Sequence, residues 1–268
     1  MRALFKVGLG LVLLAVLLTA LAYGALRANG SSSISSPAAR LVRSESRSVG
    51  AAVTAVDLSG PINLTLTQGA TPSLRVSGEQ RLLQNVETRV DGNVLHIGTT
   101  GMLFHHREPL QVDVVLPTLD KIDLDGSGES TINGFSGKTL ALTMRGSGSV
   151  SFNGRFQQIA ASASGSGDLT LNGGNSDSVT LNMIGSGRLE ASGSSKTLVA
   201  VLTGSGDLDA EHLATDTVQL TLQGSGSADV FAKLGAELTL RGSGDIRVYG
   251  NPERRNERHN GSGNVTWE

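Results

Sequence analysis

The sequence has no cysteine and few aromatic residues, and both absences narrow what the chain can be. Without cysteine there are no disulfides, no thiolate zinc sites, no cysteine nucleophile and no N-terminal cysteine that could carry a lipid. Aromatic residues make up 3% of the chain and the formal net charge is −2. The chain therefore has neither the stacking rings nor the positive excess that nucleic acids require, and we expect no nucleic-acid partner.

Familiar catalytic and metal-binding motifs are also missing. The sequence contains no Gly-x-Ser-x-Gly elbow and no His-Glu-x-x-His pair, and Gly137-Lys138-Thr139 lacks the earlier glycine of a P-loop. His105, His106 and Glu108 lie close together, but adjacent histidines face opposite sides of a strand or are exposed in a loop. We interpret them as a solvated loop and expect no metal and no cofactor.

What the sequence does contain is a repeated Gly-Ser-Gly triplet. The triplet recurs every 18 to 20 residues over more than half of the chain. Its copies begin at Gly126, Gly146, Gly165, Gly185, Gly204, Gly224, Gly242 and Gly261. A fixed period of this length is typical of a solenoid, in which each coil buries its apolar side chains only against its neighbours.

Apolar residues alternate on both sides of each triplet. Leu140, Leu142 and Met144 precede the second triplet at every other position, and Val150 and Phe152 follow it. A period of two indicates strands. A further glycine eight places after the first glycine of five triplets predicts a second corner; these glycines are Gly134, Gly154, Gly173, Gly193 and Gly250.

The repeat therefore predicts an all-β fold, a parallel β-helix of about eight coils over residues 120–268. Each coil consists of a strand, the Gly-Ser-Gly corner, a second strand and a second corner with a short connector. We expect the eight triplet serines to form a hydrogen-bonded file along one edge, with small polar residues on the outward faces.

Residues 1–26 have the features of a targeting segment. Arg2 and Lys6 precede an uncharged apolar run that ends at Leu26, a pattern that leaves the N-terminus in the cytoplasm and exports the rest. This hydrophobic helix is either a cleaved signal peptide or an uncleaved membrane anchor, because it is long enough to span a membrane and also contains small residues at cleavage spacing. Residues 27–47, rich in serine, are expected to form a flexible linker.

Residues 48–119 are rich in strand signals but have no fixed period. Ile62, Leu64 and Leu66 alternate as in a strand, and we expect this part to be an irregular entry that covers the N-terminal edge of the column.

At the other end, Arg255, Glu257 and His259 occupy places that are apolar in earlier coils. This substitution predicts a polar last coil that closes the column.

In this order, the motifs resemble the head GIN domain family of auto-transporter adhesins. The resemblance runs from about residue 48 to the C-terminus. The residues that carry it are Gln68-Gly69, the run Asp91–Ile97, Val112–Pro117 with Leu119, the triplets and Gly250-Asn251-Pro252. It implies a right-handed β-helix that lies outside the cytoplasm, in the periplasm or on the cell surface.

One column of carboxylates is a candidate site. Glu190, Asp209 and Asp229 occupy the same outward place in successive coils, followed by Arg247. Stacking would place neighbouring carboxylates about 5 Å apart, a spacing that suits a retaining glycosidase. We interpret the column as a solvated acidic strip, and the alternative is an enzyme that acts on polysaccharides.

Aspartate also follows three of the triplets, as in calcium-binding β-rolls. The residues are Asp168, Asp207 and Asp245, but Arg188 occupies the same place in a coil between them. The nine-residue period of those calcium sites is missing too. We therefore expect no calcium in this row.

These observations favour an exported, non-enzymatic β-helix of the cell envelope that is adhesin-like or structural. Its partner would be a protein or glycan surface, and residues 1–26 would contact the membrane if they are uncleaved. Two alternatives stay open: the polysaccharide-active enzyme, and a membrane-anchored envelope sensor.

Overall fold

The computed structural model describes residues 41–100 and 109–268, and Val42–Glu268 form one compact unit. The predicted targeting segment, the linker up to residue 40, and His105, His106 and Glu108 lie outside the described residues. Among the residues that are described, no helix is both long enough and apolar enough to cross a membrane.

The described chain is almost entirely β-structure, with the short helix α2 (Gln80–Leu83) near the start. The strands join into one 17-stranded hydrogen-bonded sheet. They are β1 (Val42–Arg47), β2 (Ala55–Ser59), β3 (Ile62–Gln68), β4 (Ser73–Glu79), β5 (Val86–Asp91), β6 (Val94–Thr99), β7 (Leu110–Leu116), β8 (Lys121–Gly126), β9 (Glu129–Gly146), β10 (Ser149–Gly165), β11 (Asp168–Gly185), β12 (Arg188–Gly204), β13 (Asp207–Gly224), β14 (Ser227–Gly242), β15 (Asp245–Tyr249), β16 (Arg254–Gly261) and β17 (Asn264–Trp267).

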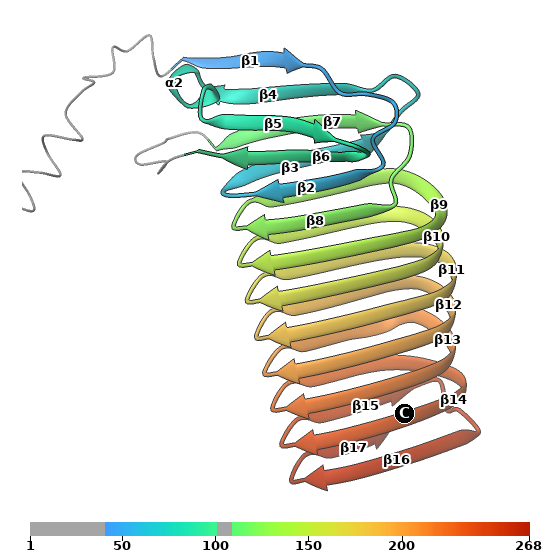
Figure 1. Ribbon diagram of the computed structural model, residues 1–268. Coiled ribbons are helices and arrows are strands. Elements are labelled where there is room, and N and C mark those ends of the chain that lie inside the picture. Colours follow the sequence, from blue (N-terminus) through green and yellow to red (C-terminus); the bar gives the residue numbers. More distant parts are fainter. Residues whose placement is uncertain (1–40, 101–108) are drawn as a thin grey trace, which may run out of the picture. The chain divides into compact units, whose positions relative to one another are not determined.

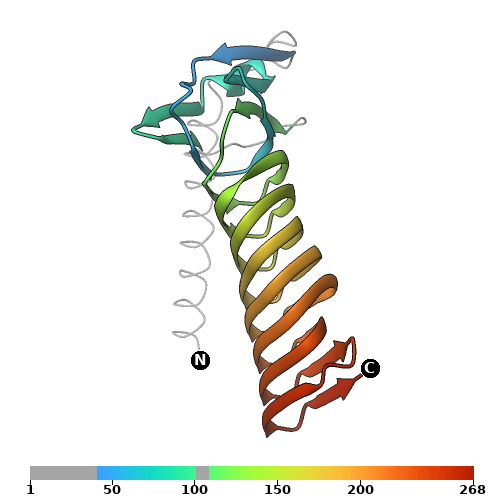
Figure 2. The ribbon, with the colours of Figure 1, turned by 90° about the vertical axis from the view of Figure 1, so that its right-hand side faces the viewer.

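The long strands β9 to β14 each wrap once around a right-handed parallel β-helix (Figure 1). The solenoid has about 7 turns, since eight triplets bound seven intervals. We call the strand segments that precede the triplets the front sheet; their arrowheads in Figure 1 end at the Gly-Ser-Gly corner. The segments that follow the triplets form the back sheet, and both meet again at the second corner, which faces the viewer in Figure 2.

The predicted alternation produces the core. Leu181, Ala200 and Leu220 are stacked in register in the front sheet and are at most 2% exposed. Phe152 and Phe156 fill the wider part of the interior near the second corner, with ring centroids 6.1 Å apart. The core is one continuous apolar file between two sheets, as expected for coils that gain burial only by stacking.

Sterics explain the Gly-Ser-Gly corner. A Cβ on Gly204 would lie 2.3 Å from the carbonyl oxygen of Gly185 in the preceding coil, and Gly204 also has φ +124°. The same oxygen accepts hydrogen bonds from the amides of Ser205 (2.9 Å) and Gly206 (3.1 Å). Two adjacent amides thus converge on one carbonyl, and only glycine leaves room for that approach.

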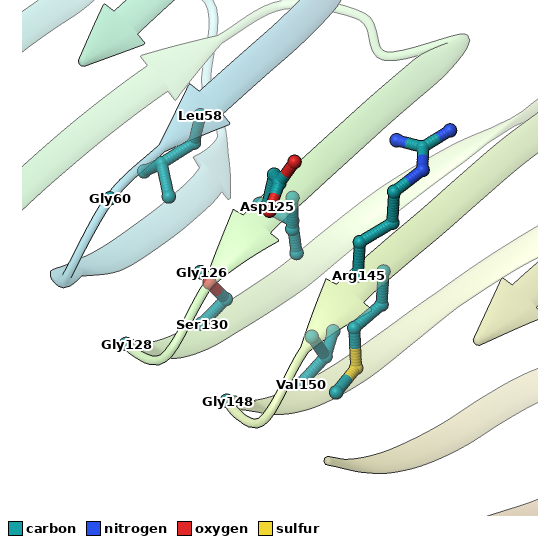
Figure 3. Close-up of a pocket in the computed structure, with 11 residues that line it drawn as sticks. Leu58, Gly60, Asp125, Gly126, Gly128, Ser130, Arg145, Gly148 and Val150 are labelled. Atoms are coloured by element: carbon teal, nitrogen blue, oxygen red, sulfur yellow. The ribbon is translucent and has the colours of Figure 1, made fainter. Parts of the chain in front are cut away.

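Figure 3 shows the first of these corners, where Gly126, Gly128 and Gly148 follow one another along the edge. The cavity enclosed there has a volume of about 10 Å³. That volume is at the lower limit for one water molecule, so this corner is a packing feature and not a ligand site.

The predicted file of hydrogen-bonded serines is wrong for all but its last pair. Of the eight triplet serines, only Ser262 and Ser243 are joined through their hydroxyls, at 3.2 Å. The backbone amides already satisfy the corner carbonyls, so the serine hydroxyls point to solvent and are not needed for stacking.

The N-terminal entry is more regular than predicted. Strands β2 and β3 pair in parallel with β8 and β9, and Gly60 (φ +106°) takes the place of a triplet glycine between them. A Cβ on Gly126 would lie 2.2 Å from the Gly60 carbonyl oxygen, the same contact as at later corners. Part of residues 48–119 is therefore solenoid, although only one glycine of the triplet is present.

The first strand corrects the predicted boundary of the linker. The serine-rich composition predicts a flexible linker up to residue 47, but residues 42–47 form β1, which pairs antiparallel with β4. The Arg47 side chain donates hydrogen bonds to the backbone oxygens of Val86 (2.6 Å) and Leu83 (3.0 Å). These contacts attach β1 to the antiparallel strands that cover the N-terminal edge.

At the C-terminal end, a cation–π contact closes the column. The Arg255 guanidinium lies 4.9 Å from the centre of the Trp267 ring, and its Nε donates to the Pro252 oxygen at 3.0 Å. Trp267 packs against the core, while all of β16 is exposed. The charged last coil predicted from the sequence is present and ends the apolar file.

Candidate functional site

The middle of the front sheet is a surface without charge. Residues 158–164, 178–184, 197–203 and 217–223 contain no Asp, Glu, Lys, Arg or His. We call their outward side chains the uncharged panel. They are Gln158, Ala160, Ser162 and Ser164; Ser178, Thr180, Asn182 and Ile184; Thr197, Val199, Val201 and Thr203; and Thr217, Gln219, Thr221 and Gln223.

The panel is regular because no register shift interrupts it. The four strand segments pair residue by residue, and every shift in these ladders falls near the second corner. Four strands about 4.8 Å apart and seven residues of about 3.3 Å make a surface of roughly 20 by 20 Å. Ile184 and Val201 lie on it with 52% and 37% exposure. The sequence predicted small polar outward residues here but did not single out these two apolar ones.

Charged residues bound the panel at both ends of the front sheet. On the N-terminal side Arg145 lies beside Ser164, and the Lys121–Asp123 pair (2.7 Å) follows one strand farther out. On the C-terminal side Glu237 lies beside Gln219 and pairs with Arg258 at 2.9 Å. The centre of a protein interface is depleted of charge and its rim is polar. The panel and its charged borders follow that distribution.

The back sheet brings the predicted carboxylates together. Glu190 lies beside Asp209, Asp209 beside Asp229, and Asp229 beside Arg247, each pair in direct register. Glu190, Asp209 and Asp229 line none of the three larger hollows described below. The column therefore exists as expected, but it stands on the open face of a sheet.

Asp229 is the most constrained member of the column. Its side chain is 21% exposed, and its Oδ1 lies 3.0 Å from Arg247 Nε without the alignment of a hydrogen bond. Burial raises the pKa of Asp229, Arg247 opposes that rise, and nearby Asp209 adds to it. Asp229 therefore holds its proton more tightly than an ordinary carboxyl and lies next to a second acid, Asp209; a general acid needs such a difference in pKa between neighbouring carboxyls. The ion pair with Arg247 also makes Asp229 part of the packing between coils.

Asp209, Glu211 and His212 form a second grouping that the sequence did not reveal. Their potential ligand atoms all lie within 4.8 Å of one another. Glu211 and His212 are at the end of the back sheet, where β13 bends into the second corner. Carboxylate and imidazole ligands suit a divalent cation, but the exposed position of His212 provides no enclosure for one.

Two of the three aspartates that follow triplets, Asp168 and Asp207, have a structural role. Asp168 accepts the amide of Arg188 at 3.2 Å, and Asp207 accepts both the amide (3.1 Å) and the hydroxyl (2.6 Å) of Ser227. Both carboxylates therefore bind the next coil directly, which gives Asp168 and Asp207 a role in stacking the coils.

Hollows occur where the register is broken or the strands splay. One, of about 260 Å³, lies between β2, β5 and β6, where His96 Nδ1 and Asp57 Oδ2 are 2.9 Å apart. Two more, of about 310 and 280 Å³, lie at the second corner. The larger is lined by Ser136, Asn153 and Arg155. We call the smaller one, between β11 and β14, the edge groove.

Solved structures with a similar fold include proteins from the genus Parabacteroides. A "putative adhesin" from Parabacteroides distasonis superposes with a TM-score of 0.80 at 22% identity, covering 85% of this chain and 97% of that one. A "putative adhesin" from Parabacteroides merdae gives 0.79 at 20% identity, covering 85% and 96%. A "putative lipid binding protein" from Parabacteroides distasonis gives 0.79 at 20% identity, with the same coverage.

These likenesses establish the fold, and a search among curated proteins found no match. The family model described as "Putative auto-transporter adhesin, head GIN domain" matches residues 52–252. That range contains the uncharged panel, the carboxylate column and the edge groove. The chain belongs to the head GIN domain family.

Proposed function

We propose that this chain is an exported, non-enzymatic, adhesin-like module that binds another macromolecular surface through the uncharged panel. The observation that carries the proposal is the run of four in-register front-sheet segments without a charged residue. The family and the adhesin-named structures of the same fold support it.

The physical argument concerns desolvation. A charged side chain loses its hydration when a partner covers it, and this loss is costly unless a matching charge is supplied. Threonine, serine, asparagine and glutamine lose less and can form new hydrogen bonds, while Ile184 and Val201 gain from burial. A rigid sheet also loses little entropy on binding, because its side chains are short and its backbone is fixed.

A pair of double variants tests the panel. Ile184→Lys/Val201→Lys places two charges on neighbouring strands of the front sheet, and Ser151→Lys/Thr170→Lys places two on neighbouring strands of the back sheet, where both residues are exposed. Beads coated with the full-length chain are tested on immobilised matrix glycoproteins and on whole bacterial cells. We expect the panel variant to lose adhesion by at least about tenfold, which corresponds to about 1.4 kcal/mol, and the back-sheet variant to keep it.

Equal adhesion of both variants, or wild-type adhesion no greater than that of albumin-coated beads, would refute the proposal. Location is tested separately, by protease shaving of intact cells that carry an epitope after Glu268. Loss of the epitope from unbroken cells is expected for a surface adhesin, and protection until the envelope is opened would place the module in the periplasm.

The non-enzymatic part of the proposal has its own test. The triple variant Glu190→Gln/Asp209→Asn/Asp229→Asn should leave adhesion within about twofold of wild type, a change under about 0.5 kcal/mol. Release of reducing sugar from a polysaccharide by the wild-type chain, abolished in the triple variant, would instead identify the column as a glycosidase site.

A further inference from the structure

The edge groove is a polar hollow on the narrow side of the column, where it adjoins the end of the uncharged panel at Thr197 and Thr217. It has a volume of about 280 Å³ and lies on the edge that faces the viewer in Figure 2. Its wall residues include Asn175, Ser194, Lys196, Asp216, Phe231 and Lys233. These residues come from four successive coils, so the groove exists only in the stacked column.

The groove arises because the connectors differ in length. Register shifts occur between Asn172 and Asn175 and between Ala210 and Thr215, and they displace the chain at the second corner. Asn175, Ser194 and Ala214 lie beside one another in successive coils, and the last two are small. Bulges with small side chains leave a depression between the larger residues on either side.

Buried hydroxyls fix the floor of the groove. Ser195 and Thr215 are neighbours in register and are 6% and 1% exposed. Ser195 donates to the Thr197 oxygen at 2.9 Å, and Thr215 donates to the Phe231 oxygen. Because these hydroxyls have backbone partners, the floor is a rigid support and the ligand-facing chemistry belongs to the walls.

The walls carry both hydrogen-bond donors and acceptors. Lys196 is held by Asp177 at 2.6 Å, and Asp177, with a smaller effect from Asp216, raises the pKa of the Lys196 amine. Lys233 adds a second ammonium, and the half-buried Phe231 ring contributes an apolar surface. With Asp177 included, two lysines and two aspartates balance one another.

A ligand for such walls should be small in cross-section, rich in hydroxyls, uncharged and apolar on one face. A pyranose ring has all of these properties, because its hydroxyls both donate and accept while its C–H face packs on an aromatic ring. The groove is slightly smaller than the usual range for drug-sized ligands, about 300–1,000 Å³, which suits one sugar unit.

The 310 Å³ hollow and the acidic residues of the back sheet indicate the length and the charge of the ligand. The 310 Å³ hollow lies on the same edge, and its lining residues Ser136 and Arg155 are neighbours in register. The Arg155 side chain also reaches the groove, because it lies 3.0 Å from the position of a Cβ on Gly174, the residue before Asn175. A linear chain could therefore contact both. Asp209 on the adjacent back sheet would disfavour a polyanion, while the neighbouring Asp229 is paired with Arg247.

We propose that the edge groove binds a linear uncharged polysaccharide, with one sugar ring packed on Phe231 and its hydroxyls bonded to Ser194, Lys196 and Asp216. This site shares no lining residue with the uncharged panel, so it goes beyond the adhesin function proposed above. An adhesin with both would recognise a glycan chain along its edge and a broader surface with its front sheet.

A matched pair of alanine substitutions tests the groove. Ala214 lines it and Ala160 lies on the uncharged panel, and both are exposed. Ala214→Trp fills the groove without removing a hydrogen bond, and Ala160→Trp adds the same bulk elsewhere. The probes are the β-1,4-linked hexasaccharides of glucose and of N-acetylglucosamine, with heparin as a polyanion, measured by calorimetry on the full-length chain in detergent.

We expect the wild-type chain to bind at least one neutral hexasaccharide, Ala214→Trp to weaken binding at least about tenfold, and Ala160→Trp to bind as wild type does. Phe231→Leu should also weaken binding, whereas Tyr249→Leu, its neighbour in register, should not. Undetectable binding of both neutral hexasaccharides, equal affinity of Ala214→Trp, or tighter binding of heparin would overturn the proposal.

The two proposals fail independently. If Ala160→Trp reduces bead adhesion but not glycan affinity while Ala214→Trp does the reverse, the chain has two sites. If Ala214→Trp binds glycan as wild type does while the lysine variants of the panel abolish adhesion, the groove proposal is wrong and the adhesin proposal stands.

Discussion

Replacing Gly204 by alanine should destabilise the column for two separable reasons. The backbone there has φ +124°, which costs a residue with a Cβ about 1–2 kcal/mol. The new Cβ would also lie 2.3 Å from the Gly185 oxygen, so the coils must separate. Separation weakens the two amide bonds to that oxygen, each worth about 0.5–1.5 kcal/mol. The sum predicts a loss of about 2–5 kcal/mol.

Three further glycines separate the causes. A Cβ on Gly187 would lie 2.0 Å from the Gly167 oxygen, but Gly187 does not have a left-handed φ. Gly92 has φ +60°, but a Cβ there would meet no atom within 4 Å. Gly50 has neither a left-handed φ nor an atom within 4 Å of the Cβ position. We expect Gly187→Ala to lose about 1–3 kcal/mol from separated coils and Gly92→Ala about 1–2 kcal/mol from strain. Gly50→Ala should lie within about 0.5 kcal/mol of wild type.

Guanidinium unfolding followed by circular dichroism near 218 nm measures these differences as shifts in midpoint and slope. Solenoids can unfold in segments, so equal slopes in wild type and variant are the condition for comparing free energies. A Gly187→Ala variant as stable as Gly50→Ala would refute the steric reasoning, because it would show that the corner tolerates a Cβ.

Three other measurements follow from single contacts. Thr215→Val removes a buried hydroxyl that donates to a backbone oxygen and should lower the unfolding free energy by about 1–3 kcal/mol, with recovery in Thr215→Ser. Because burial raises the pKa of Asp229, the folded state should lose stability as the pH rises above the usual value of 3.8. Asp229→Asn should lack this part of the decline in unfolding midpoints with rising pH. Arg255→Ala should red-shift the fluorescence of Trp267, the single tryptophan, whereas Arg254→Ala should leave it unchanged.

The sequence predicted most of the fold because its constraints are local. Alternation around residues such as Leu181 fixes which side chains point inward, and each triplet glycine marks a place where coils approach too closely for a Cβ. The same spacing correctly placed Glu190, Asp209 and Asp229 in one column.

Prediction failed where a glycine pattern was incomplete or where a partner was distant in sequence. The coil at Gly60 was missed because only one glycine of the triplet remains, and β1 was read as linker because its partner β4 lies some thirty residues on, with Val42 opposite Glu79. The serine file was wrong because the sequence does not show that backbone amides already fill the corner carbonyls.

By itself, then, the sequence determined the period, the inward and outward faces and the charge-free stretch of the front sheet, since all three depend on steric and hydrophobic rules that act within one coil. Only the tertiary structure shows that an edge groove forms and that the Arg255 guanidinium stacks on the Trp267 ring at the C-terminal end of the column. Connectors of unequal length shift the register at the second corner, and counting residues along one coil does not reveal which side chains of the next coil will lie beside them.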